Sequence, residues 1–182
     1  VLVFDDANVE QAATTLARLK TRNAGQVCVS PSRFYVQSKI YDRFAARFIE
    51  TIKSINVGNG LEKSTQMGPL TMARQLDRVQ GYIAAGRSEG ARLACGGGRP
   101  KHLHKGYYVE PTVFVDVKPD MKIFQEEIFG PVVSVVAYTD EDDAVAKAND
   151  SNYGLSGAVF TTNPDRGYAM ARRMRTGSVT VN

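Results

Sequence analysis

The chain has 182 residues, of which 43% are apolar and 23% charged, and its formal net charge is +4. A chain of this length fits one domain, and no apolar run reaches the roughly 18 residues that a membrane-spanning helix needs. Lysine and arginine are scattered, without a motif of nucleic-acid readers, and two cysteines are too few for a disulfide framework. We expect a cytoplasmic protein with free thiols whose partners include neither nucleic acid nor a membrane.

The chain opens with a strand-like apolar run at 1–4 that leads into a helical pattern. Apolar residues recur at helical spacing from Val9 to Leu19, which predicts a helix with both of these residues on its inner face. The candidate N-caps of this helix are Asp5, Asp6 and Asn8.

Two further helices are predicted in the first half of the chain. "RFYVQ" has the composition of a strand, and Ser38 after it can cap a helix in "SKIYDRFAARFIETIKSI". The next helical pattern covers residues 71–89, with Met72 among its inward residues and Gly90 as its stop.

The second half continues the alternation of strands and helices. The runs "ARLACGG", "YYVEPTVFVDV", "GPVVSVV" and "LSGAVFTT" predict strands, and the third is apolar enough to be covered on both faces. Thr139 with Asp142 has the spacing of a capping box, and Asn163 with Pro164 marks the start of the last helix. Strands separated by helices predict a three-layer α/β/α domain with a largely parallel sheet.

Glycine and histidine motifs elsewhere in the chain indicate no ligand site. The run "GGG" at 96–98 precedes no helix start and predicts a turn, and no GxGxxG follows any strand, so the dinucleotide fingerprint of the Rossmann fold is absent. His102 and His104 lie two residues apart, without other ligands nearby in sequence, and we predict no metal site. The same histidines would be the only bases for a cysteine hydrolase, an alternative that stays open.

Cys28 and Cys95 are the only cysteines. A cysteine among small apolar residues is by default a buried hydrophobe, which is how we interpret Cys95. Cys28 lies in "NAGQVCVS", after a predicted helix has ended and where Gly25 permits an unusual turn, so the loop can present its thiol to a cleft.

Seven motifs give the chain its resemblance to a known family. In order they are "FDDANVEQA", "RNAGQVCVSPSRFYV", "MGPL", "GYYVEPTVF", "EEIFGPVVSV", "ANDSNYGLSGAVFT" and "TGSVTVN". Together they span essentially the whole chain, and it resembles the catalytic domain of the aldehyde dehydrogenase superfamily.

The resemblance implies a function and a set of site residues. The expected reaction is oxidation of an aldehyde to a carboxylic acid with NAD or NADP, through a thiohemiacetal and a thioester on Cys28. By motif position Glu127 is expected to bind the nicotinamide ribose and Phe129 to pack beside the nicotinamide. Gln75 and Arg78 match positions at which relatives touch the cofactor ribose. Glu126 and Asn23 are expected to be structural.

The resemblance also implies the domain organisation. Residues 1–182 are expected to form the cysteine-bearing domain, truncated at both ends, with the coenzyme domain and the family's general base outside the chain. The isolated chain is then expected to be inactive, and its parent to be a homodimer or homotetramer. A binding or assembly module that keeps the fold without the chemistry is the alternative, and the particular aldehyde is left open.

Overall fold

The computed structural model describes all residues from 1 to 182 and is built on one seven-stranded sheet. The strands are β1 (Leu2–Val3), β2 (Arg33–Gln37), β3 (Arg92–Cys95), β4 (Thr112–Val115), β5 (Val132–Tyr138), β6 (Ser156–Phe160) and β7 (Ser178–Val181). Their order across the sheet is β3-β4-β5-β2-β1-β6-β7. Only β3 runs antiparallel to its neighbour, and all other pairs are parallel. The predicted, largely parallel sheet is confirmed.

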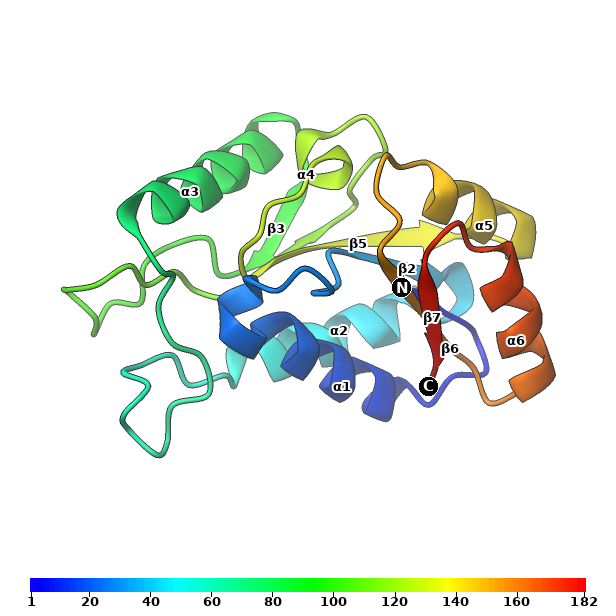
Figure 1. Cartoon of the computed structure of the whole chain (residues 1–182), viewed down its shortest axis with the longest axis horizontal. Coiled ribbons are helices and arrows are strands. Elements are labelled where there is room, and N and C mark those ends of the chain that lie inside the picture. Colours follow the sequence, from blue (N-terminus) through cyan, green and yellow to red (C-terminus); the bar gives the residue numbers. More distant parts are fainter.

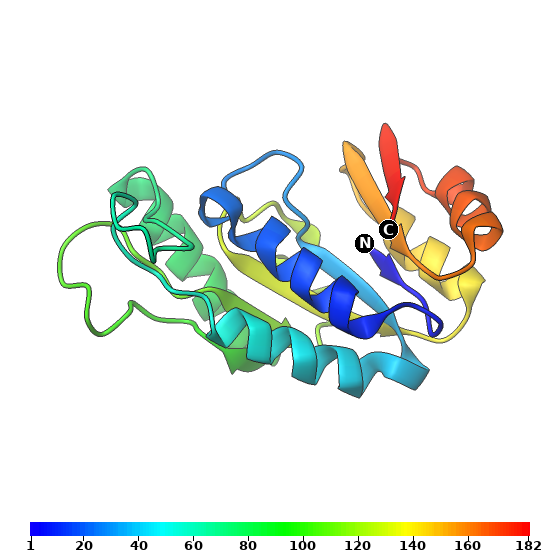
Figure 2. The ribbon, with the colours of Figure 1, turned by 90° about the horizontal axis from the view of Figure 1, so that it is seen from below.

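Helices cover both faces of this sheet, as Figure 1 shows. They are α1 (Val9–Thr21), α2 (Tyr41–Lys53), α3 (Ala73–Ser88), α4 (Lys122–Gln125), α5 (Glu141–Asn149) and α6 (Pro164–Arg173). Helices α1 and α2 lie side by side on one face (Figure 2), and α3 to α6 pack into the core on the other. The three-layer α/β/α prediction is confirmed. None of the helices is long and apolar enough to cross a membrane.

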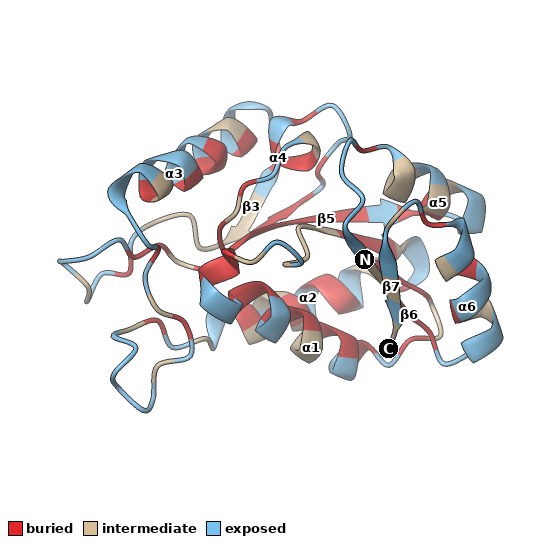
Figure 3. Ribbon diagram, in the orientation of Figure 1, coloured by how far each residue is buried: buried red, intermediate tan, exposed pale blue.

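The two cores follow from the side-chain alternation along the central strands. On β5, Val133 and Val135 join the core under α1 and α2, whereas Val132 and Val136 join the core under α3 to α6. All four are almost completely buried. Figure 3 shows the same concentration of buried residues along the sheet, so the continuous apolar run predicted to be covered on both faces is confirmed.

Two helix faces differ from the sequence prediction. Leu19 on α1 is 43% exposed and Met72, just ahead of α3, is 47% exposed, so neither is a core residue. Lys20 takes the inward position of α1 in place of Leu19. Asn8 caps α1 by accepting a hydrogen bond from the Gln11 amide, which confirms one of its three candidate caps.

The helix caps in the rest of the chain are partly as predicted. Asn163 caps α6 and Pro164 opens it, as expected. Ser38 does not cap α2 because its hydroxyl donates to the carbonyl of Tyr138 instead. The cap of α5 is Asp140, one residue after the predicted Thr139, since Asp140 accepts from the Asp143 amide.

Candidate active site

The segment that carries Cys28 begins with a left-handed turn directly after α1. Asn23, Ala24 and Gly25 all have positive φ, at 49°, 53° and 72°. The turn is closed by a reciprocal pair, in which the Asn23 side chain donates to the Gln26 carbonyl and the Gln26 side chain donates to the Asn23 carbonyl, both at 3.0 Å. Asn23 therefore has a structural part, since it shapes the turn that redirects the chain toward Cys28.

Gln26 anchors this turn to the segment ahead of α3. Its side chain is buried, and its oxygen accepts from both the amide and the hydroxyl of Thr71, at 3.0 and 3.1 Å. The residue two positions before Cys28 is thereby fixed to a segment far away in sequence, which leaves the Cys28 turn little freedom to shift.

Cys28 lies exposed in a turn that the Ser30 amide closes by donating to the Val27 carbonyl at 2.9 Å. Its neighbour Val29 is 49% exposed. The backbone N–H of Cys28 donates no hydrogen bond within the chain. The turn therefore presents a thiol together with a free N–H donor, the pair of groups that a covalent reaction at a carbonyl carbon uses.

A second loop, residues 126–131 between α4 and β5, packs against the Cys28 turn. A β-carbon built on Gly25 would lie 2.2 Å from the Gly130 carbonyl oxygen, so the two backbones touch. A β-carbon on Gly130 would in turn lie 2.5 Å from a methyl group of Val79 on α3. Phe129, next to Gly130, is half-buried and has a φ of 56°. Two glycines thus let α3, this loop and the Cys28 turn stack without side chains between them.

Helix α3 holds the backbone of the second loop. Gln75 donates to the carbonyls of Ile128 and Phe129, at 3.2 and 2.7 Å. Arg78 donates to the carbonyl of Glu127 at 2.6 Å. These two residues, expected to touch the cofactor, are brought to the site, and the contacts they make within the chain fix the loop.

The two adjacent glutamates of this loop have different surroundings. Glu126 accepts a hydrogen bond from the Tyr82 hydroxyl at 2.7 Å; burial, together with this bond, raises the pKa of Tyr82. Glu127 is held only through its backbone, whose N–H donates to the Tyr153 hydroxyl at 3.2 Å. The carboxylate of Glu127 is exposed and has neither a hydrogen bond nor an ion pair within the chain, so it is free to accept from a ligand.

Sequence reasoning missed Lys20, whose side chain is 2% exposed in the last turn of α1. Burial lowers its pKa from 10.5 to about 7, and the charge of Glu127 opposes that shift. The helical period alone allowed either residue to face inward, because Leu19 and Lys20 lie three and four residues after the buried Leu16 and so on the same face of the helix. The sequence analysis chose Leu19 because it is the more hydrophobic of the two.

The loops of the site share one edge of the sheet. The Cys28 turn leads into β2, the Glu127 loop leads into β5, and the segment of Tyr153 leads into β6. Because these strands are parallel, all three segments meet at the amino ends of the strands. A hollow of about 400 Å³, lined by residues 152–154 and 174–176, opens at the same edge. Ligands of doubly wound sheets usually bind at the opposite, carboxyl edge.

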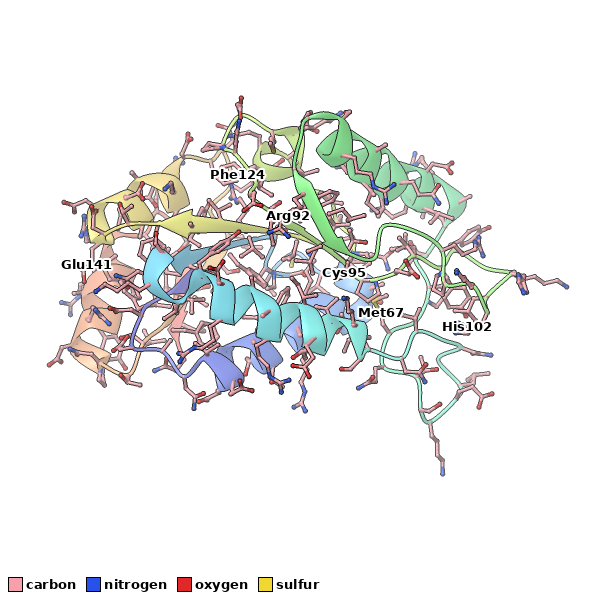
Figure 4. All side chains as sticks on the ribbon, turned by 180° about the vertical axis from the view of Figure 1, so that it is seen from behind. Met67, Arg92, Cys95, His102, Phe124 and Glu141 are labelled. Atoms are coloured by element: carbon pink, nitrogen blue, oxygen red, sulfur yellow. The ribbon has the colours of Figure 1, made fainter.

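Cys95 lies in a different setting. It ends β3 and is half-buried, and burial raises the pKa of its thiol. It borders a second hollow, of about 440 Å³, whose lining includes Lys53 and His102. Figure 4 shows Cys95 at the end of its strand and His102 in the following loop. His102 forms a hydrogen bond with the carbonyl of Val57, and neither it nor His104 forms one with Cys28, so the pairing that a cysteine hydrolase would use is not seen.

The fold and this edge define a class: an α/β/α domain that presents an exposed thiol at the amino ends of a parallel sheet. The model of the aldehyde dehydrogenase family matches residues 1–182. The chain belongs to the aldehyde dehydrogenase family.

Individual relatives support the same assignment. The chain is 44% identical to a betaine aldehyde dehydrogenase of Brucella anthropi over 184 aligned residues, covering 100% of this chain and 38% of the relative. Among solved structures, the betaine aldehyde dehydrogenase of Staphylococcus aureus in complex with NAD+ has a TM-score of 0.97 at 38% identity, over 99% of this chain and 37% of that one. The aldehyde dehydrogenase of Mycobacterium tuberculosis with NAD+ has a TM-score of 0.96 at 41% identity, over 99% and 38%. The chain thus spans less than two fifths of the length of these relatives.

Proposed function

We propose that residues 1–182 form the cysteine-bearing domain of an NAD(P)-dependent aldehyde dehydrogenase, and that the longer protein oxidises an aldehyde to a carboxylic acid. The observation that carries the proposal is the exposed thiol of Cys28, with its free N–H, packed through Gly25 against the loop of Glu127. In a member of this family, that juxtaposition combines a nucleophile with acceptor groups for a cofactor.

Cys28 acts as the nucleophile in this proposal. The Cys28 thiol first gives its proton to water, and the thiolate sulfur then forms a bond to the aldehyde carbon, so that the carbonyl π bond opens and the negative charge moves to oxygen. The free N–H of Cys28 stabilises that oxyanion by a hydrogen bond. Loss of hydride from the same carbon leaves a thioester on Cys28, and water then cleaves the carbon–sulfur bond, which releases the carboxylic acid and restores the thiol.

The second loop fits a nicotinamide dinucleotide. Bound NAD(P)+ would supply the hydride acceptor. The unpaired carboxylate of Glu127 offers two acceptor oxygens for the two hydroxyls of a ribose, and Phe129 offers an aromatic face next to it. Gln75 and Arg78 keep the backbone of both residues in place. A coenzyme domain elsewhere in the longer protein, and assembly into a homodimer or homotetramer in the cytoplasm, belong to the same proposal.

Two facts about the relatives guide the choice of assay. The relatives just described from Brucella anthropi and Staphylococcus aureus are named betaine aldehyde dehydrogenases, so betaine aldehyde is the first substrate to test, followed by aliphatic aldehydes. The Staphylococcus aureus structure contains a cysteine modified by BME, which shows that a thiol of that relative is open to small reagents.

The decisive experiment replaces Cys28 by alanine in the full-length protein and follows formation of reduced cofactor. We expect turnover to fall by at least about a thousandfold, with circular dichroism unchanged, because the covalent intermediate cannot form. Cys95→Ala is the matched control and should keep turnover within about twofold. Turnover retained by Cys28→Ala would overturn the proposal.

A further inference from the structure

The second loop carries two adjacent glutamates that face opposite sides. Glu126 has a φ of −105° and a ψ of 155°, an extended backbone in which successive side chains alternate. Ile128, two residues later, is buried in the same core as Tyr82 of α3, and Tyr82 also bonds the carboxylate of Glu126. Glu126 and Ile128 thus share the side that faces α3, whereas Glu127 between them is exposed on the other side.

Tyr82 holds the Glu126 side chain on the α3 side of the loop. The tyrosine is buried, and its hydroxyl donates to the Glu126 carboxylate at 2.7 Å. The same hydroxyl accepts from Arg78, one helical turn earlier, at 3.4 Å, and Arg78 donates to the Glu127 carbonyl at 2.6 Å. The Lys122 ammonium lies 5.4 Å from the centre of the tyrosine ring. Packing and hydrogen bonds therefore fix the phenol before any ligand is present.

We propose that Tyr82 is a positioning residue that determines which of the two glutamates is presented to the ribose of a dinucleotide. The inference rests on the proposed role of Glu127. A slip of the loop by one residue would turn Glu126 outward and Glu127 inward, since adjacent side chains alternate. Hydrogen bonds from α3 to backbone carbonyls do not oppose such a slip, because every residue carries a carbonyl. The bond from Tyr82 to a carboxylate does oppose it.

The effect of this bond on binding follows from populations. A ligand that needs Glu127 facing outward binds with an affinity reduced by the fraction of molecules in which the loop has that arrangement. One hydrogen bond to a charged acceptor is enough to change a local two-state population by about tenfold. Loss of the Tyr82 hydroxyl should therefore weaken dinucleotide binding while the ring still fills its place in the core.

The test uses the full-length protein and measures the Kd of the reduced dinucleotide by fluorescence titration. Tyr82→Phe keeps the ring and removes the hydroxyl, and we expect it to raise the Kd by about fivefold. Glu126→Gln keeps an acceptor for the Tyr82 hydroxyl and should stay within about twofold of wild type. Tyr168→Phe on α6 is the matched control, since it removes an exposed hydroxyl, and it should leave the Kd unchanged.

Two further measurements distinguish positioning from a general loosening of the structure. In a Glu127→Ala background, Tyr82→Phe should change the Kd by less than about twofold, because no carboxylate is left to position. ADP lacks the nicotinamide ribose that Glu127 is proposed to bind. Its Kd, measured by calorimetry, should therefore be the same for Tyr82→Phe and wild type.

The outcomes separate this inference from the proposed function. An equal rise of the dinucleotide Kd in both backgrounds, a parallel rise for ADP, or no rise with Glu127 intact would overturn the role of Tyr82 alone. A dinucleotide Kd that Glu127→Ala leaves unchanged would overturn the cofactor role of Glu127, and the role of Tyr82 with it. Loss of activity in Cys28→Ala is independent of both results.

Discussion

Gly25 and Gly130 pack backbone against backbone, and this contact joins the Cys28 turn to the Glu127 loop. Gly25 also has a φ of 72°, a conformation that costs a residue with a β-carbon roughly 1–2 kcal/mol. We predict that Gly25→Ala destabilises the chain by at least about 2 kcal/mol, because the new methyl group would lie 2.2 Å from the Gly130 oxygen. Urea unfolding measures the change. Gly60→Ala, whose new methyl group would have no atom within 4 Å, should shift stability by less than about 0.5 kcal/mol.

The two thiols should differ in reactivity. Cys28 is exposed, whereas Cys95 is half-buried and its pKa is raised by burial, so less of its thiolate is present near neutral pH. We predict that iodoacetamide modifies Cys28 at least about tenfold faster than Cys95, as mass spectrometry of Cys28→Ser and Cys95→Ser chains would measure. Equal, slow modification of both would favour the alternative of a binding module without chemistry.

Loss of the Gln75 amide should loosen the second loop. Gln75→Leu leaves the carbonyls of Ile128 and Phe129 without their donor, which we expect to cost about 1–2 kcal/mol in urea unfolding. Gln80→Leu on the exposed face of the same helix is the control and should stay within about 0.5 kcal/mol. A Gln75 variant as stable as this control would show that the loop holds its shape without α3.

Asp6 should support stability in a pH-dependent way. Although burial opposes its ionisation, hydrogen bonds from Thr161 and Thr162 and the nearby Arg166 lower its pKa below 3.8. A lowered pKa means that the stabilisation is complete above the unfolded value and is lost as the pH falls through the folded value. We predict that Asp6→Asn costs about 1–2 kcal/mol at neutral pH and that its stability converges with wild type in acid.

The control for this prediction is Asp120→Asn, since Asp120 is exposed and makes no hydrogen bond with its side chain. Parallel acid-unfolding curves for wild type and Asp6→Asn would contradict the prediction. A steeper wild-type curve below about pH 4 would support it.

Lys20 should give a second pH dependence of the same sign, at higher pH. Its pKa is lowered from 10.5 to about 7, so the unfolded chain binds more protons between these values and stability rises with pH across that window. We predict that Lys20→Met, which keeps the length of the stem and removes the charge, gains most stability relative to wild type below pH 7, and that this gain shrinks by about 2–3 kcal/mol between pH 6 and pH 9. Chemical denaturation at the two pH values measures this. An advantage independent of pH would mean that Lys20 is not buried as a charge.

The sequence predicted those parts of the fold in which a local pattern has one physical solution. The apolar, valine-rich run of β5 favours a strand covered on both faces, and Asn163 before Pro164 favours a helix start, as the structure has them. The sequence-based prediction was wrong where a local pattern allows two arrangements, as on the inner face of α1. Leu19 and Lys20 are adjacent positions on one helix, and which of them faces inward depends on how α1 packs against segments far away in sequence.

The candidate site was predictable in its residue types but not in its arrangement. The family motifs singled out Cys28 and Glu127, but nothing local shows that Gly25 and Gly130 touch or that Gln75 and Arg78 reach the loop backbone. These contacts depend on tertiary packing between α3, the loop and the end of α1. Within its own segment, neither a hydrogen-bond donor such as Gln75 nor a glycine such as Gly130 indicates which distant segment it contacts.

The pairing of β2 with β5 brings together the Cys28 turn, which leads into β2, and the Glu127 loop, which leads into β5. The ladder runs from Arg33 beside Ser134 to Gln37 beside Tyr138, and α2, α3, β3 and β4 all lie between these strands in the chain. Pairings across so long a connection form slowly, because loop-closure entropy is lost before contacts compensate for it. During synthesis, the Cys28 turn therefore leaves the ribosome well before the loop that packs against it. Gly25 meets Gly130 only once this ladder can close, so an unfinished chain carries the cysteine without that loop beside it.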